Sequence, residues 1–319
     1  MLNADKTEFE FTSDFDGLKV SALIAKPTGD INGIVQIVHG MYEHKELYFD
    51  FMDYLAGEGF TTVIHDNRGH GKSICSEDDL GFMFRNGDKG FAEDIFQLKT
   101  LVRKANPDIP YFIIGNDIGS LGVRCMLKEH DSDICGVIVL GCPCYSMLSG
   151  FYRAISSEYG GESRERNKRI AEAMEKTFGK GFDGSKRAWI SSQKETVEQF
   201  LSDPLSNFDY TLNGYECILR MIKETYSKSG WQVSDPSLPI RFISGRDDTF
   251  MLSEAKFMKA LNLLDRVGYG SISHRLFDGM RHNVLFEKNN INVYKDIAKT
   301  IYSWLDRLPS GQSAIRGRS

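Results

Sequence analysis

The chain has, at residues 111–124, the sequence YFIIGNDIGSLGVR. Its first four residues are apolar, which is typical of a short buried strand, and apolar residues from position 121 onward recur at helical spacing. Between these two parts, Gly115 and Gly119 flank three residues, and small residues allow the backbone to turn sharply. The segment therefore predicts a strand that passes through a tight turn into a helix, with Asp117 at the centre of the turn.

Asp117 occupies the central position of the pattern G-x-S-x-G, the nucleophile elbow. In that motif a strained turn exposes a nucleophilic side chain above the end of a sheet. Here a carboxylate replaces the serine hydroxyl. Ser120 is a tempting substitute, but three residues further along a helix it would point away from the turn. Asp117 is therefore the candidate at the nucleophile position.

Short apolar runs alternate with helical patterns on both sides of this segment. Residues 8–12 and 18–26 are joined by the turn sequence DFDG and predict a hairpin. The other predicted strands are residues 33–38, 60–64, 134–140, 239–244 and 271–277, and the other predicted helices are residues 47–58, 91–105, 254–267 and 290–305. Runs that are apolar throughout are typical of parallel strands covered on both faces. The pattern predicts an α/β fold whose mostly parallel central sheet is flanked by helices.

Residues 145–236 interrupt this alternation. They are rich in helix formers, charges and aromatic residues such as Trp189, Tyr210 and Tyr215. We interpret them as a helical cap over a pocket, although a helical subdomain with an aromatic core would give the same pattern. The expected division is a core of residues 1–144 and 237–308, a cap of residues 145–236 and a disordered tail of residues 309–319.

Three further candidates follow predicted strands. Met41 lies in the loop after residues 33–38, where its N–H and that of Ile118 could stabilise an oxyanion. Asp248 and His282 follow the last two strands, which gives the order nucleophile, acid, base along the chain. The predicted catalytic set is Asp117, Asp248 and His282, with Met41 and Ile118 as the oxyanion hole.

These motifs resemble those of the monoacylglycerol lipase and lysophospholipase-like group of α/β-hydrolases, also described as serine aminopeptidase-like. The carriers are HGMYEH at 39–44, DNRGHGKS at 66–73, GNDIG at 115–119, SGRDD at 244–248 and GMRHN at 279–283. The resemblance spans about residues 8–306 and implies an α/β-hydrolase fold and hydrolysis of carboxylic or lipid esters. It also implies Asp248, rather than Asp247, as the triad acid, because the acid of the group often stands immediately before a pair of the Pro-Val type. The chain departs from the group at Asn116, usually His, and at Asp117, usually Ser.

The exchange at Asp117 leaves three hypotheses open. A carboxylate that attacks an ester gives an intermediate that reverts, and two carboxylates beside His282 favour an imidazolium that cannot act as a base. The first hypothesis is therefore an ester hydrolase that is weakened, or whose nucleophile has been altered. The second is an aspartate-nucleophile hydrolase of epoxides or alkyl substrates, although Ile118 replaces the tryptophan of halide enzymes and Tyr42 the proline of epoxide hydrolases. The third is a non-catalytic protein that keeps the pocket for binding.

Composition limits the kinds of partner that the protein is expected to bind. The formal net charge of -5 is spread along the chain and gives no basic footprint for nucleic acid. No apolar run approaches the roughly 20 residues of a membrane span, and the N-terminal residues lack an apolar signal core. We expect a cytoplasmic protein with a small ester or lipid-like substrate. The six cysteines are expected to be reduced, and neither they nor the histidines have the spacing of a metal site, so we expect no cofactor.

Overall fold

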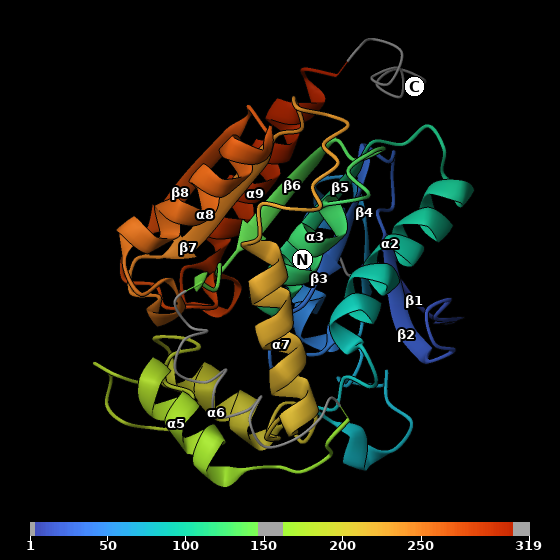
Figure 1. Ribbon diagram of the computed structural model, residues 1–319. Helices are drawn as coiled ribbons and strands as arrows, with labels where there is room; N and C mark the ends of the chain where they lie inside the picture. Colours follow the sequence, from blue (N-terminus) through green and yellow to red (C-terminus); the bar gives the residue numbers. More distant parts are fainter. Residues whose placement is uncertain (1–3, 146–161, 309–319) are drawn as a thin grey trace.

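The computed structural model describes residues 4–145 and 162–308, which form an eight-stranded sheet with helices on both faces (Figure 1). The strand order is β1-β2-β4-β3-β5-β6-β7-β8. β2 pairs antiparallel with β1 and β4, and all other neighbouring pairs are parallel. The strands are β1 Asp5–Thr12, β2 Lys19–Lys26, β3 Gly33–Val38, β4 Phe60–His65, β5 Tyr111–Asn116, β6 Gly136–Leu140, β7 Ile240–Gly245 and β8 Ile272–Phe277. The predicted α/β fold with a mostly parallel sheet is confirmed.

The central strands are apolar at successive positions because helices cover both faces of the sheet. In β5, Tyr111 and Ile113 join the apolar cluster that contains α2, α3 and α8, whereas Phe112 and Ile114 join the cluster that contains α1 and α9. These helices are α1 Phe49–Gly57, α2 Gly87–Ala105, α3 Ile118–Leu127, α8 Glu254–Val267 and α9 Asn290–Leu305. Successive residues of a strand point to opposite faces, so two helical layers bury the whole strand.

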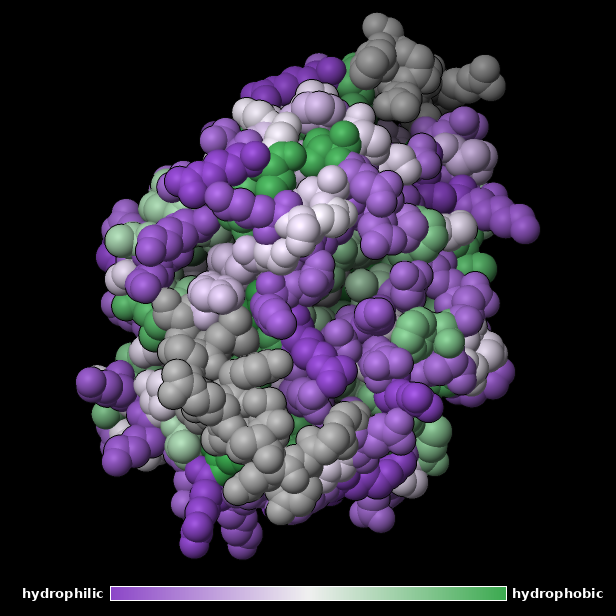
Figure 2. Space-filling model, viewed as in Figure 1, coloured by the Kyte–Doolittle hydropathy of each residue, from purple (hydrophilic) through white to green (hydrophobic). Residues whose placement is uncertain are grey.

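Among the described residues between β6 and β7 there are three α-helices: α5 Lys168–Phe178, α6 Lys194–Ser202 and α7 Leu212–Thr225. Figure 1 shows α5 and α6 beyond the sheet, while α7 runs from them back toward it and packs against α2 and α3. Residues 146–161 of the predicted cap, and the predicted tail at 309–319, lie outside the described residues. Hydrophilic side chains cover most of the face shown in Figure 2. In the described ranges, no helix combines the length and the apolar character needed to cross a bilayer.

Most predicted elements differ from the observed ones by a few residues at their ends. α8 and α9 begin and end at the predicted residues. The helix predicted at 47–58 is instead a 3-10 turn, Lys45–Tyr48, followed by α1, a distinction that helix propensity does not make. The helix predicted from residue 91 begins at Gly87. Its first turn was not predicted because it contains two glycines, which have a low helix propensity. Gly90 is needed there, since a Cβ at this position would lie 2.3 Å from the guanidinium carbon of Arg68.

Candidate active site

Asp117 lies in the turn between β5 and α3 with φ 48° and ψ −116°. A residue with a side chain rarely adopts such a backbone conformation, so the surroundings must enforce it. A Cβ on Gly115 would lie 2.7 Å from the carbonyl oxygen of Gly119, and a Cβ on Gly119 would lie 2.2 Å from that of Val38. The two glycines therefore let the chain turn tightly enough to direct the Asp117 side chain out over the end of the sheet.

The structure brings Asp117, His282 and Asp248 together in a buried row. His282 Nδ1 lies 2.9 Å from Asp248 Oδ1, and His282 Nε2 lies 3.4 Å from Asp117 Oδ1. The second distance is that of an ion pair and does not meet the geometry of a hydrogen bond. Asp248 is oriented by the Ser244 hydroxyl, which donates to Oδ2 at 2.7 Å, and by the Phe250 N–H, which donates to Oδ1 at 2.8 Å. The histidine thus has a fixed carboxylate on one side and a second carboxylate on the other.

This arrangement holds a proton on His282. Burial alone would lower the pKa of the imidazole, but the charges and contacts of Asp248 and Asp117 outweigh it and raise the pKa to about 10. Both ring nitrogens then carry a proton at neutral pH. His282 is therefore an imidazolium in the resting site and cannot accept a proton until one negative charge beside it is removed.

The oxyanion loop, residues 39–44, which contains the predicted donor Met41, contacts the other oxygen of the Asp117 carboxylate. The Met41 N–H donates to Asp117 Oδ2 at 2.8 Å. Ile118 is the first residue of α3, where backbone N–H groups have no acceptor within the helix. The carboxylate of Asp117 therefore lies where the predicted oxyanion hole would receive an oxygen of the substrate.

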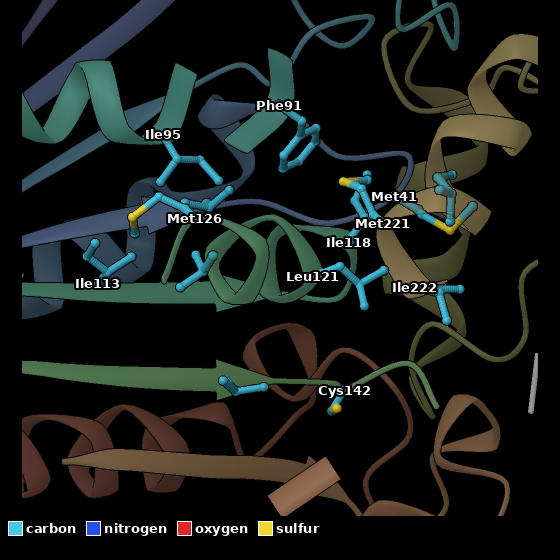
Figure 3. Close-up of a cluster of buried hydrophobic side chains, with 14 of the residues drawn as sticks. Met41, Phe91, Ile95, Ile113, Ile118, Leu121, Met126, Cys142, Met221 and Ile222 are labelled. Carbon is cyan, nitrogen blue, oxygen red and sulfur yellow. The ribbon is translucent and has the colours of Figure 1, made fainter. Parts of the chain in front are cut away.

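An apolar pocket adjoins Asp117. Apart from Asp117 and the hydroxyl of Tyr215, the described residues of its lining carry no polar side-chain group: Met41, Ile118, Pro143, Met174, Phe178, Ile218, Leu219, Ile222 and Phe250. Figure 3 shows side chains of this region gathered where the start of α3 approaches α7. The free volume is about 20 Å³, which is room for about one water molecule. Side chains of α5 and α7 must therefore move before a larger ligand can enter.

A buried carboxylate beneath the oxyanion loop was missed from the sequence. Glu43 accepts hydrogen bonds from the Gly40 N–H at 2.6 Å, the Tyr48 hydroxyl at 2.5 Å, and the side-chain amides of Asn116 and Asn283. It thereby joins the loop after β3 to the last residue of β5 and to the loop after β8. The only signal was the presence of Glu43 and Asn283 inside the motifs HGMYEH and GMRHN, which says nothing of their contacts.

A second missed contact links the oxyanion loop to the segment between β6 and β7. His44 Nδ1 lies 2.7 Å from Glu46 Oε2, and His44 Nε2 lies 2.6 Å from Asp203 Oδ2. Burial lowers the pKa of His44, but its hydrogen bonds to Glu46 and Asp203 outweigh burial and raise it. Asp203 directly follows α6. Asp203 lies more than 150 residues from His44 along the chain, so local sequence patterns could not predict the contact.

The described residues offer no alternative centre of metal chemistry. Within residues 4–145 and 162–308, no group of three His, Cys, Asp or Glu side chains is arranged to hold a metal ion. All six cysteines are free, and burial raises the pKa of the Cys142 thiol, which disfavours a reactive thiolate.

Comparison with known proteins gives one family match and several distant relatives. The sequence model of the family described as serine aminopeptidase S33 matches residues 29–289. This range includes the oxyanion loop, the Asp117 turn and the loop that carries His282. The match therefore covers more than half of the chain and every candidate site residue.

Individual relatives are less than one third identical. The monoacylglycerol lipase of Mycolicibacterium smegmatis is 20% identical over 306 residues, which are 96% of this chain and 100% of that protein. The monoglyceride lipase of Mus musculus is 25% identical over 125 residues, so this match spans 39% of the chain but only 40% of the mouse protein. A thermostable carboxyl esterase from Bacillus coagulans, solved with glycerol, has a TM-score of 0.79 at 24% identity, covering 94% of this chain and 98% of that one. At this identity the structural likeness shows the fold.

Proposed function

The chain belongs to the serine aminopeptidase S33 family of α/β-hydrolases, and from this premise we propose that its site is built to hydrolyse carboxylic or lipid esters. It is an α/β-hydrolase of the monoacylglycerol lipase and esterase type. The observation that carries the proposal is the position of His282, within ion-pair or hydrogen-bond distance of both Asp248 and Asp117. In this assignment Asp248 is the triad acid, His282 is the base, and Asp117 occupies the nucleophile position.

The substrate class is an ester with an apolar chain. The pocket beside Asp117 is lined almost wholly by hydrocarbon and thioether groups, several of them from α5 and α7. We assign residues 145–236 to a cap, and we propose that its described helices α5 and α7, which line this pocket, move to admit the substrate. The names of the relatives, monoacylglycerol and monoglyceride lipases, agree with such a substrate.

Asp117 blocks ester hydrolysis by the chain as it stands, for three physical reasons. Attack of a carboxylate on an ester carbonyl gives an intermediate that expels the carboxylate more easily than the alkoxide. In addition, the resting His282 already carries the proton that a general base would have to accept. The Asp117 carboxylate also accepts the Met41 N–H that would otherwise stabilise the oxyanion of an ester.

Replacing Asp117 by serine tests the proposal. Asp117→Ser removes one negative charge beside His282 and frees the Met41 N–H, so it should create hydrolysis of short p-nitrophenyl esters. Adding His282→Ala should reduce the rate at least about a thousandfold, because triad members act as a unit. In the Asp117→Ser background, Asp248→Asn should also remove activity, whereas Asp247→Asn should not, since Asp247 is exposed.

One result would contradict the ester-hydrolase proposal. A folded Asp117→Ser protein, checked by thermal unfolding, that hydrolyses no ester of any chain length would exclude an ester-hydrolase site. The protein would then keep its pocket for another purpose, either binding or hydrolysis of an epoxide or alkyl substrate through Asp117.

A further inference from the structure

We propose that Arg187 is a positioning residue of the site: it holds the oxyanion loop through the ring of Tyr42, and the segment that it anchors, residues 187–191, holds the backbone of His282. This segment belongs to the residues between β6 and β7. One part of the cap therefore contacts both the loop of the oxyanion donor and the loop of the base. The inference rests on the proposed function only in the roles given to Met41 and His282.

Tyr42 has a strained backbone. Its φ is 60°, in the left-handed region that a bulky residue rarely adopts. Such a conformation persists only where the surrounding structure enforces it. Tyr42 directly follows Met41, whose N–H donates to Asp117, and Gly40 on the other side donates its N–H to Glu43. The position of the Met41 N–H therefore depends on two anchors, and the surroundings of Tyr42 are the second.

The guanidinium of Arg187 lies over the Tyr42 ring, with its carbon atom 3.7 Å from the ring centre. Arg187 is 0% and Tyr42 4% exposed, and removal from water strengthens the attraction between a cation and an aromatic face. Nη2 donates to the carbonyl oxygen of Phe208 at 2.7 Å, and Nη1 donates to that of Ser206. The two carbonyl groups thus fix the guanidinium in place over the ring.

The charge of Arg187 is poorly compensated for a buried group. Among the described residues, the one carboxylate within ion-pair distance is that of Glu175, whose Oε1 lies 3.7 Å from Nε, and Nε has no hydrogen-bond partner. A buried charge of this kind is costly and is weak evidence for stability. Arg187 also has a φ of 60°, so a second strained residue faces the first. Strain and a buried charge at one contact beside the site indicate a geometric role.

The same segment holds the loop after β8. The His282 N–H donates to the carbonyl oxygen of Trp189 at 3.2 Å, and the Asn283 N–H donates to that of Ile190 at 2.9 Å. The Trp189 ring meets the His282 ring edge to face, with 5.5 Å between the ring centres. Because a single residue separates Arg187 from Trp189, displacement of Arg187 would reach both the oxyanion donor and the base.

The contact can be tested in the full unaltered chain, without catalysis. In protein labelled with heavy nitrogen at methionine, the Met41 amide is the signal that disappears in Met41→Leu. Arg187→Met should shift this amide proton upfield and speed its hydrogen exchange at least about tenfold, because its hydrogen bond to Asp117 weakens. Should Arg187→Met not fold, Arg187→Lys gives the same test, since lysine keeps the charge but lacks the planar fork.

A second test uses Asp117→Ser, the background in which ester hydrolysis is expected. There Arg187→Met should lower kcat and kcat/KM together by about 100-fold, the loss expected when an oxyanion donor is displaced. With Tyr42→Gly also present, the same change should cost at most about threefold. Glycine adopts a φ of 60° without help, and no ring remains for Arg187 to hold.

Arg166→Met is the matched control. Arg166 is also an arginine of the cap that binds backbone carbonyl oxygens, namely those of Asp78, Leu80 and Asp209. It lies outside residues 187–191 and has no contact with the oxyanion loop. The control should leave the Met41 amide signal and kcat unchanged, even where it lowers the melting temperature.

Two results would overturn the proposal. One is an unchanged Met41 amide in a folded Arg187 variant. The other is an equal loss of kcat from Arg187→Met with and without Tyr42→Gly, because Arg187 would then act independently of Tyr42. An Asp117→Ser protein without esterase activity would count against the proposed function instead, and the amide measurement would still decide the role of Arg187.

Discussion

Glu43 holds the loop after β3, which carries the proposed oxyanion donor Met41, through buried hydrogen bonds. An ionised carboxylate has about four acceptor sites, and four donors reach it: the Gly40 N–H, the Tyr48 hydroxyl and the amides of Asn116 and Asn283. Gly40 directly precedes the residue whose N–H contacts Asp117. The network therefore helps to fix the position of the Met41 N–H, the proposed oxyanion donor.

Glu43→Gln should destabilise the protein by about 1–3 kcal/mol near neutral pH, because an amide has one acceptor oxygen and leaves buried donors unpaired. The loss should depend on pH. Burial raises the pKa of Glu43 from 4.5 to about 7, against the pull of its donors, so the folded chain binds this proton more tightly than the unfolded chain. This contribution to stability is therefore largest at low pH and falls as the pH rises from about 4.5 to about 7. Urea unfolding of both proteins should give a larger difference near pH 5 than near pH 8.

Gly119 offers a test of the strained turn. A Cβ at this position would lie 2.2 Å from the Val38 oxygen and 2.6 Å from that of His39, both backbone atoms that cannot move aside. Gly119→Ala should therefore lower the free energy of unfolding by several kcal/mol or prevent folding. Gly57→Ala is the matched control, since a Cβ there meets nothing within 4 Å, and it should change stability by at most about 1 kcal/mol. Equal stability of the two variants in urea unfolding would contradict the close packing of the turn.

At the scale of elements, His44 couples the loop after β3 to the end of α6. Its pKa is raised by hydrogen bonds to Glu46 and Asp203, which overcome the effect of burial. Glu46 also lies 3.0 Å from Lys45 Nζ, and its pKa is lowered to about 2 despite burial, so it stays ionised. A protonated His44 thus forms hydrogen-bonded ion pairs with the carboxylates of both Glu46 and Asp203.

This contact should stabilise the fold mainly at low pH. The folded chain holds the His44 proton more tightly than the unfolded chain, so the stabilisation is fully present below pH 6.5 and is lost as the pH rises through the raised pKa. The melting temperature of the unaltered protein should exceed that of His44→Gln by more near pH 6 than near pH 9. His274→Gln, at an exposed position in β8, is the control for removal of an imidazole outside this contact. A constant difference across this range would mean that His44 acts through packing and not through its charge.

The elements and the contacts between them were not equally predictable. β3, α8 and α9 could be bounded from the sequence because apolar period, turn residues and helix caps agree there. The start of α2 was missed because tertiary packing, and not helix propensity, decides it at Gly90. The contacts of Glu43 and His44 were missed for a different reason. Whether a carboxylate or a histidine is buried, and which distant group meets it, leaves no local trace in the sequence.

For the whole molecule, the site depends on the topology of the sheet. Parallel strands β3, β5, β7 and β8 all end at the same edge, so the loops that follow them carry Met41, Asp117, Asp248 and His282 to one place. Sequence order was enough to expect this meeting, because parallel strands with helical crossovers have few alternative arrangements. The pocket depends instead on how α5 and α7 pack over that edge, which the helical and aromatic composition of residues 145–236 could not specify.

The pocket as a whole makes a prediction about ligands that holds whichever chemistry the site performs. In the part of the chain that the structure describes, its lining is apolar except for Tyr215 and the carboxylate of Asp117, so a neutral apolar ligand should enter more readily than an anion. Decanol should raise the melting temperature of the protein, since a ligand that binds only the folded state at 100 times its Kd adds about 2.7 kcal/mol. Decanoate should have little effect near pH 8, because its carboxylate would meet that of Asp117 in a buried site. Asp117→Asn removes this repulsion and should bring the shift caused by decanoate close to that caused by decanol. An equal shift by both ligands in the unaltered protein would mean that they bind elsewhere than beside Asp117.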